Sequence, residues 1–114
     1  MKIGFFLNFE NSVGGGHFWR CFNLAKKLKK TGRNFYFFSN IKDNFFLTML
    51  KKNNFKHIEI FEKNKKKLIK KLIEKSTYLM ISNLIIDNYK INYHDEKKIK
   101  TVIKRLIVID DHDS

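Results

Sequence analysis

Residues 2–8, KIGFFLN, followed by GGGHFWRC at residues 14–21, decide the fold of this chain. The first stretch is almost continuously apolar, which is typical of a strand buried on both faces of a parallel sheet. From residue 17 the apolar side chains recur every three or four positions, and lysines occupy the positions between them up to residue 30. This period predicts an amphipathic helix, and Gly32 stands where a glycine ends such a helix. The opening of the chain is therefore a strand, a glycine-rich loop and a helix.

The same alternation continues to the end of the sequence. Further short apolar runs occupy residues 35–38, 56–61, 84–86 and 106–109, and helical periodicity occupies residues 43–52, 65–79 and 93–104. Strands that alternate with helices predict right-handed βαβ units. We therefore expect an α/β fold, a Rossmann-like parallel sheet of about five strands with flanking helices, forming one domain over residues 1–114.

This topology brings distant segments together. In an open parallel sheet the segments that follow the strands all emerge at one edge, where such folds bind ligands. Residues 8–17, 40, 87–89 and 110–113 should therefore converge.

Composition narrows the class of protein. The chain has 114 residues and 43% hydrophobic residues, enough for one core, and its one cysteine, Cys21, excludes a disulfide scaffold. No apolar run approaches the ~20 residues of a membrane span. We expect a soluble cytoplasmic protein with no membrane partner.

The net charge of +13 comes mostly from lysine, because only three of the 24 basic residues are arginine. Lysine shares A/T-rich codons with the abundant asparagine, isoleucine and phenylalanine, whereas nucleic-acid readers favour arginine. We interpret the lysines as solubilising surface residues and do not expect nucleic acid as a partner.

Three of the five glycines, Gly14, Gly15 and Gly16, are consecutive and lie between the first strand and the first helix. Glycines let a ligand approach the main chain closely, and a helix N-terminus favours phosphate. An ordinary flexible loop is the alternative. A Walker loop is excluded because His17 follows the glycines, and the dinucleotide fingerprint fails at Trp19 and Asn40. A nucleoside-diphosphate ligand remains compatible.

His17 is the first candidate for chemistry. The positive end of the helix dipole disfavours a protonated ring, so a neutral imidazole beside a phosphate cradle could act as a general base. A histidine that only begins the helix is the other reading. His17 and Cys21 have the spacing of two metal ligands, but the sequence offers no further cysteine, and we expect no metal. Cys21 is interpreted as a small core residue.

Arg20 and three aspartates complete the candidates. Arg20 lies three residues after His17, nearly on the same helix face, and could reach a phosphate, brace an acidic loop or be solvated. Asp87 ends the fourth predicted strand, and Asp110 and Asp111 end the fifth. Carboxylates at such positions hold sugar hydroxyls or cap the next helix, and the sequence leaves both roles open.

These residues also resemble a known family. The segment GGGHFWRC, with Leu24-Ala25, Leu28 and Gly32 after it, is similar to the Gly-x-Gly-His-x-x-Arg-Cys signature of the UDP-2,4-diacetamido-2,4,6-trideoxy-β-L-altropyranose hydrolases of pseudaminic acid biosynthesis. Residues 85–89, IIDNY, resemble the family's Ile-Asp-x-Tyr segment, and residues 108–111, VIDD, resemble its strand-end Asp-Asp.

The resemblance implies a GT-B-like fold, a UDP-sugar substrate and no cofactor or metal. Water would attack the anomeric carbon with inversion and expel UDP, with His17 at the position of the catalytic base. Tyr89 would lie near the sugar, and the glycine loop near the diphosphate.

The chain departs from the family in two respects. Phe6 and Asn8 stand where the family usually has arginine and aspartate. Family members are more than twice this length, so we expect the chain to correspond to the N-terminal lobe, with the second, nucleotide-binding lobe absent. A glycosyltransferase lobe of the same architecture, or an inactive fragment that acts as a binding module, is the alternative.

Overall fold

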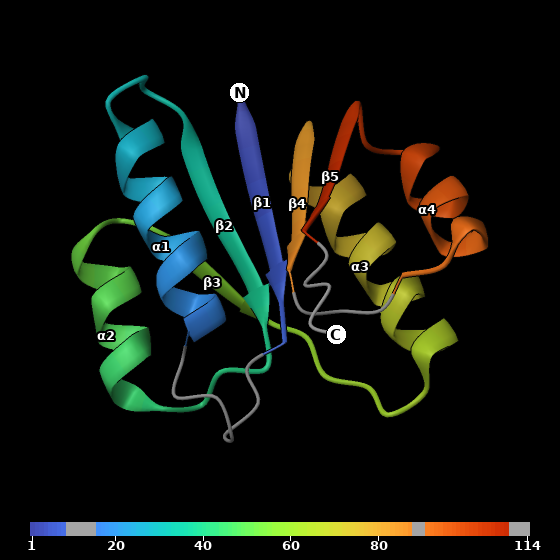
Figure 1. Ribbon diagram of the computed structural model, residues 1–114, viewed down its shortest axis with the longest axis horizontal. Coiled ribbons are helices and arrows are strands. Elements are labelled where there is room, and N and C mark those ends of the chain that lie inside the picture. Colours follow the sequence, from blue (N-terminus) through green and yellow to red (C-terminus); the bar gives the residue numbers. More distant parts are fainter. Residues whose placement is uncertain (9–15, 88–90, 110–114) are drawn as a thin grey trace.

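The protein is described here by a computed structural model for residues 1–8, 16–87 and 91–109. Across these residues strands and helices alternate (Figure 1). In chain order the elements are β1 (Lys2–Leu7), α1 (Gly16–Lys29), β2 (Asn34–Ser39), α2 (Asn44–Lys52), β3 (Lys56–Glu59), α3 (Lys65–Leu79), β4 (Asn83–Asp87), α4 (Tyr93–Lys100) and β5 (Arg105–Ile109). The strands form one parallel sheet in the order β3-β2-β1-β4-β5. The predicted Rossmann-like fold is confirmed.

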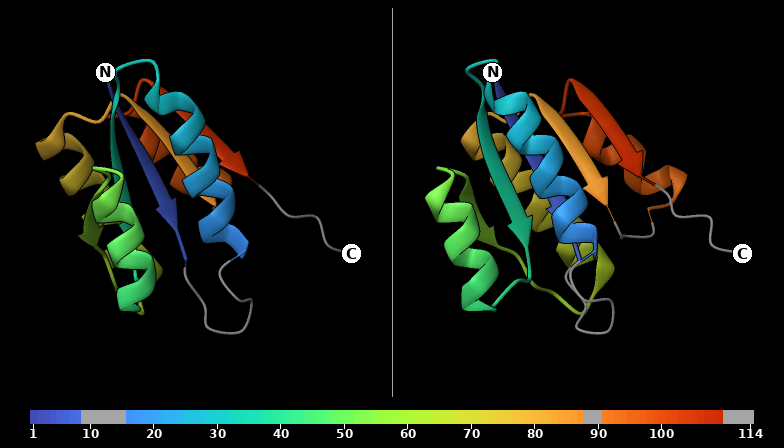
Figure 2. Two further views of the ribbon diagram at one scale, coloured as in Figure 1. Left: turned by 90° about the vertical axis from the view of Figure 1, so that its left-hand side faces the viewer. Right: turned by 60° about the vertical axis from the view of Figure 1, so that its left-hand side comes forward.

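Two helices cover each face of the sheet, with α1 and α2 on one side and α3 and α4 on the other (Figures 1 and 2). Successive residues of β1 therefore enter different cores. Phe5 packs in the cluster beneath α1 and α2, whereas Phe6 packs in the cluster beneath α3 and α4, and both are fully buried. Burial on both faces explains why the first strand is apolar without alternation.

Polar side chains cap the N-termini of α2, α3 and α4. Asp43 accepts a hydrogen bond from the backbone N–H of Phe45 at 2.8 Å at the start of α2. Asn64 caps α3 in the same way, and Asn92 forms a reciprocal capping box with Asp95 at α4. Such caps satisfy backbone donors that have no partner inside the helix.

The last helix is shorter than the sequence pattern predicts. It ends at Lys100, whereas the periodicity indicated residue 104. The backbone N–H of Lys104 instead donates to the carbonyl of Ser82 at 2.9 Å, which starts the pairing of β5 with β4. Ile103 is buried in the turn, so the apolar period continues after the helix has ended.

The strand order creates a topological switch point between β1 and β4. The connection after β1 leads to α1 on one face, whereas the connection after β4 leads toward α4 on the other (Figure 1). Crevices for ligands form at the carboxyl ends of such strands. Asn8 and Asn40 follow β1 and β2, and Nδ2 of Asn40 donates to Oδ1 of Asn8 at 3.0 Å. The predicted convergence is thus observed for Asn8 and Asn40; residues 9–15, 88–89 and 110–113 lie outside the described residues.

Candidate functional site

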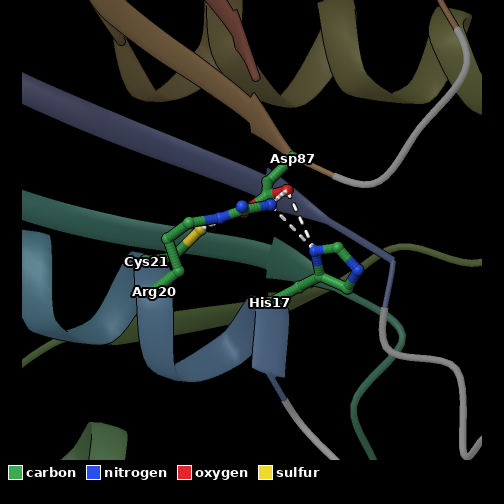
Figure 3. Close-up of polar contacts among 4 residues, drawn as sticks. All are labelled: His17, Arg20, Cys21 and Asp87. Atoms are coloured by element: carbon green, nitrogen blue, oxygen red, sulfur yellow. Dashed lines mark hydrogen bonds and ion pairs between the residues drawn. The ribbon is translucent and has the colours of Figure 1, made fainter. Parts of the chain in front are cut away.

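A cluster of side chains from α1 meets the end of β4 at this switch point (Figure 3). Asp87 is the last residue of β4 and pairs in register with Leu7, the last residue of β1. Gly16 begins α1, and His17 is therefore held one residue into the helix. Among the described residues, no atom lies within 4 Å of a Cβ placed on Gly16, so packing against them does not require glycine there.

Asp87 is a fully buried carboxylate, and Arg20 pairs with it through two hydrogen bonds. Nε of Arg20 donates to Oδ2 at 2.9 Å, and Nη2 donates to Oδ1 at 2.5 Å. A buried charge without such partners is very costly, because the interior cannot replace its hydration. The bidentate fork of arginine suits a carboxylate better than a lysine ammonium does.

Two further donors from α1 reach the same carboxyl group. Nδ1 of His17 lies 3.1 Å from Oδ1 of Asp87, and Sγ of Cys21 donates to Oδ2 at 3.4 Å. Each carboxylate oxygen therefore faces two donors. All of them come from helix positions 17, 20 and 21, which share one face of α1.

The position of Nδ1 beside Oδ1 of Asp87 indicates which ring nitrogen of His17 carries a hydrogen. Nη2 of Arg20 also lies 3.0 Å from Nδ1 of His17, but Nη2 is a donor whereas Oδ1 of Asp87 can accept from both nitrogens. The two nitrogens approach each other because both point at one oxygen (Figure 3). The geometry assigns a hydrogen to Nδ1, so in a neutral ring the lone pair lies on Nε2.

Cys21 is 1% exposed, in agreement with its prediction as a core residue. Burial raises the pKa of its thiol, and the charge of Asp87 raises that pKa further. The thiol therefore stays protonated and donates to Asp87. Within the part of the chain that the structure describes, no three histidine, cysteine or acidic side chains are grouped as a metal site would require.

The structure thus brings His17, Arg20 and Asp87 together, with Gly16 beside them. Sequence reasoning noted the shared helix face but did not predict that Asp87 joins Arg20 to His17, and it missed Cys21 as a partner of that carboxylate. One feature of the sequence could have predicted this cluster. Positions 17, 20 and 21 share a helix face, and an aspartate ends another predicted strand. The other candidate residues lie outside the described residues: Gly14, Gly15, Tyr89, Asp110 and Asp111.

A second polar pair lies at the end of β2. Oγ of the buried Ser39 lies 2.7 Å from Nε2 of His57 on β3. Burial of the ring lowers the pKa of His57, and the nearby charge of Glu59 opposes that change only in part. Sequence analysis did not single out this pair, since nothing in the local pattern marks it.

Comparisons with known proteins extend the assignment of the fold. Neither the models of protein families nor the curated proteins include a match to this chain. Among solved structures, a glycosyltransferase from Rickettsia africae ESF-5 superposes with a TM-score of 0.67 at 18% sequence identity. The alignment covers 94% of this chain and 29% of the glycosyltransferase, so the chain spans less than a third of its length.

The class defined by these observations is an α/β protein with a glycosyltransferase-like, Rossmann-like fold. At 18% identity the similarity establishes the fold alone. Among the described residues, no helix has the length and apolar character needed to cross a membrane.

Proposed function

We propose that this chain is the N-terminal lobe of a nucleotide-sugar hydrolase, with His17 as its general base. The substrate is a UDP-linked diacetamido-trideoxyhexose, and the products are UDP and the free sugar of pseudaminic acid biosynthesis. The observation that carries the proposal is the position of His17 at the switch point, with Nδ1 held by the buried carboxylate of Asp87. An imidazole in that tautomer accepts a proton at Nε2.

The reaction needs one proton transfer and one displacement. Nε2 of His17 takes a proton from water, and the water oxygen forms a bond to the anomeric carbon with inversion. The bond from that carbon to the diphosphate oxygen breaks, and UDP leaves with the electron pair. The first turn of α1 carries no acidic residue, so the positive helix end is available to stabilise the charge that develops on the diphosphate.

The remaining ligand contacts follow from the resemblance of the sequence. We assign the diphosphate to the main chain around Gly14, Gly15 and Gly16, and the sugar to Tyr89. Asp110 and Asp111, which come directly after β5, stay candidates for sugar hydroxyls. In this proposal a second lobe supplies the nucleotide contacts. The alignment with only 29% of the structurally similar glycosyltransferase supports this part.

The experiment measures release of UDP and free sugar from the UDP-linked diacetamido-trideoxyhexose. It uses the chain by itself and the chain joined to the second lobe of a hydrolase of the resembled family. His17→Gln should lower kcat by about 10²–10⁴-fold, the usual contribution of a general base. His94→Gln is the matched control, because His94 is exposed on α4, away from the switch point. Equal turnover by the His17 and His94 variants, or no UDP release by either preparation, would contradict the proposal.

The second candidate function is that of a glycosyltransferase lobe, because the structurally similar protein is a glycosyltransferase. The same assay separates the two functions when an acceptor sugar is added. A hydrolase gives free sugar whether or not the acceptor is present, whereas a transferase releases UDP only with the acceptor and forms a glycoside.

A further inference from the structure

We propose that Asp87 and Arg20 are positioning residues for His17. Asp87 sets the tautomer of the ring, Arg20 holds the carboxylate of Asp87 in place, and neither binds substrate. Where catalysis is concerned, this inference rests on the proposed function. The tautomer itself is a property of the folded chain and can be measured without any turnover.

The first step of the argument is that Asp87 has its acceptor positions occupied by its own chain. A carboxylate offers about four lone-pair sites, two on each oxygen. Oδ1 faces Nη2 of Arg20 and Nδ1 of His17, while Oδ2 faces Nε of Arg20 and Sγ of Cys21. The carboxyl group is also completely buried. A sugar hydroxyl would have to displace one of these donors, so Asp87 is poorly placed to be a sugar ligand.

The second step concerns how Asp87 is held. Its carboxylate accepts from Nδ1 of His17 only while Oδ1 faces the ring. Arg20 contacts both carboxylate oxygens, with Nε on Oδ2 and Nη2 on Oδ1, and this two-point contact fixes the orientation of the carboxylate. Asp87 therefore orients the imidazole, and Arg20 orients Asp87.

The third step concerns the guanidinium of Arg20. Two of its nitrogens, Nε and Nη2, already donate to Asp87. The edge of the guanidinium that would bind a phosphate in two places is therefore directed at the carboxylate. This differs from the sequence-based expectation that Arg20 could reach a phosphate. Loss of Arg20 should consequently affect the reaction step more than substrate binding.

The direct test is nitrogen-15 NMR of the histidine rings at a pH where they are neutral. Two-bond proton–nitrogen couplings identify which ring nitrogen carries the hydrogen. In the unmodified chain His17 should be mostly the Nδ1–H tautomer. Asp87→Leu removes the acceptor at nearly constant volume, and most of the His17 population should then become the Nε2–H tautomer. Exposed His94 serves as the internal reference and should not change.

Two further variants keep the test decisive. If Asp87→Leu does not fold, Asp87→Asn removes the charge at constant shape, and it should also reduce the Nδ1–H population. Arg20→Lys preserves the positive charge, so the Nδ1–H tautomer should persist in it. An Nε2–H ring in the unmodified chain, or a His17 tautomer unaffected by loss of the Asp87 carboxylate, would overturn the role of Asp87.

Kinetics of the active preparation test Arg20 separately. Arg20→Lys keeps the positive charge but loses the two-point contact that orients Asp87, so kcat should fall by about tenfold or more. KM should be unchanged, because Arg20 acts through Asp87 and His17 and not on bound substrate. A raised KM with unchanged kcat would instead make Arg20 a substrate ligand and reject its positioning role. The NMR result stands whichever reaction the chain catalyses, so failure of the hydrolase proposal and failure of this one can be told apart.

Discussion

At the scale of single residues, Asp87 determines how the candidate site is organised. Its carboxylate is buried, and removing one partner of a buried ion pair typically costs about 3–5 kcal/mol, because the other charge is left without compensation. Arg20 is partly exposed and can turn toward water, so the cost falls mainly on variants that keep Asp87 and lose Arg20. This asymmetry is why the tautomer test above replaces Asp87 and keeps a cation at position 20.

His57 gives the first prediction of pH dependence. Its pKa is lowered from the ordinary 6.5, so below that pH the unfolded chain binds a proton that the folded chain resists. The free energy of unfolding should therefore fall as the pH decreases below about 6.5, with a slope of at most ~1.4 kcal/mol per pH unit from this group. Urea unfolding at several pH values measures it.

His57→Gln should flatten this pH dependence, because glutamine does not titrate. His94→Gln is the control, since His94 is exposed on α4. If the slopes of the His57 variant and the unmodified chain agree, burial of His57 is not the cause of the acid sensitivity.

At the scale of the elements, α1 combines two functions on adjacent faces. Phe18 and Phe22 pack into the core against the sheet, while His17 and Arg20 point along the helix flank toward Asp87. Cys21 belongs to both faces, because it is buried in the core and donates to the carboxylate. A helix that is held firmly by its aromatic face can place the proposed base, His17, accurately.

The packing of β1 predicts that two glycines of this chain respond in opposite ways to alanine. A Cβ at Gly4 would lie 2.9 Å from Cε2 of the buried Phe38 and 3.0 Å from Cδ1 of Leu84. Gly4→Ala should therefore destabilise the fold by about 1–3 kcal/mol through overpacking. Chemical denaturation provides the measurement.

Gly16→Ala is the matched control for this prediction. No described atom lies within 4 Å of its Cβ position, and alanine favours the helix that begins there. Its stability should equal that of the unmodified chain or exceed it by up to about 1 kcal/mol. Equal losses in both variants would mean that contact with Phe38 and Leu84 does not explain the glycine at position 4.

At the scale of the whole molecule, the strand order decides which side chains meet. β1 is the central strand of the sheet, with β2 on one side and β4 on the other. β4 therefore lies directly beside β1, although more than 70 residues separate the two strands in sequence. That adjacency brings the end of β4 next to the start of α1. A different order of the same strands would leave Asp87 without its donors.

The open side of β5 predicts self-association. Ile107 pairs in register with Ile85 and so belongs to the face of the sheet that carries α1 and α2. Within the described residues these helices lie over the other half of that face (Figure 1), and Ile107 is 55% exposed. Exposed apolar edge strands associate readily. Light scattering should show a mass that rises with concentration.

Ile107→Lys should shift that association to at least several-fold higher concentration, since a charge on an edge strand opposes pairing. Tyr78→Lys is the control, because Tyr78 is exposed on α3, on the opposite face of the sheet. A monomeric chain at all concentrations, or an equal effect of both substitutions, would show that β5 is not the contact.

The sequence by itself determined the alternation of strands and helices, the parallel sheet and the edge where its loops meet. These follow from apolar periodicity and chain connectivity, which are local properties. The tertiary structure alone decided that Asp87 is enclosed by Arg20, Cys21 and His17. The pairing spans 66–70 residues and depends on strand order and on the register that sets Asp87 beside Leu7. Such long-range register follows from how both cores pack together, and no short stretch of sequence encodes it.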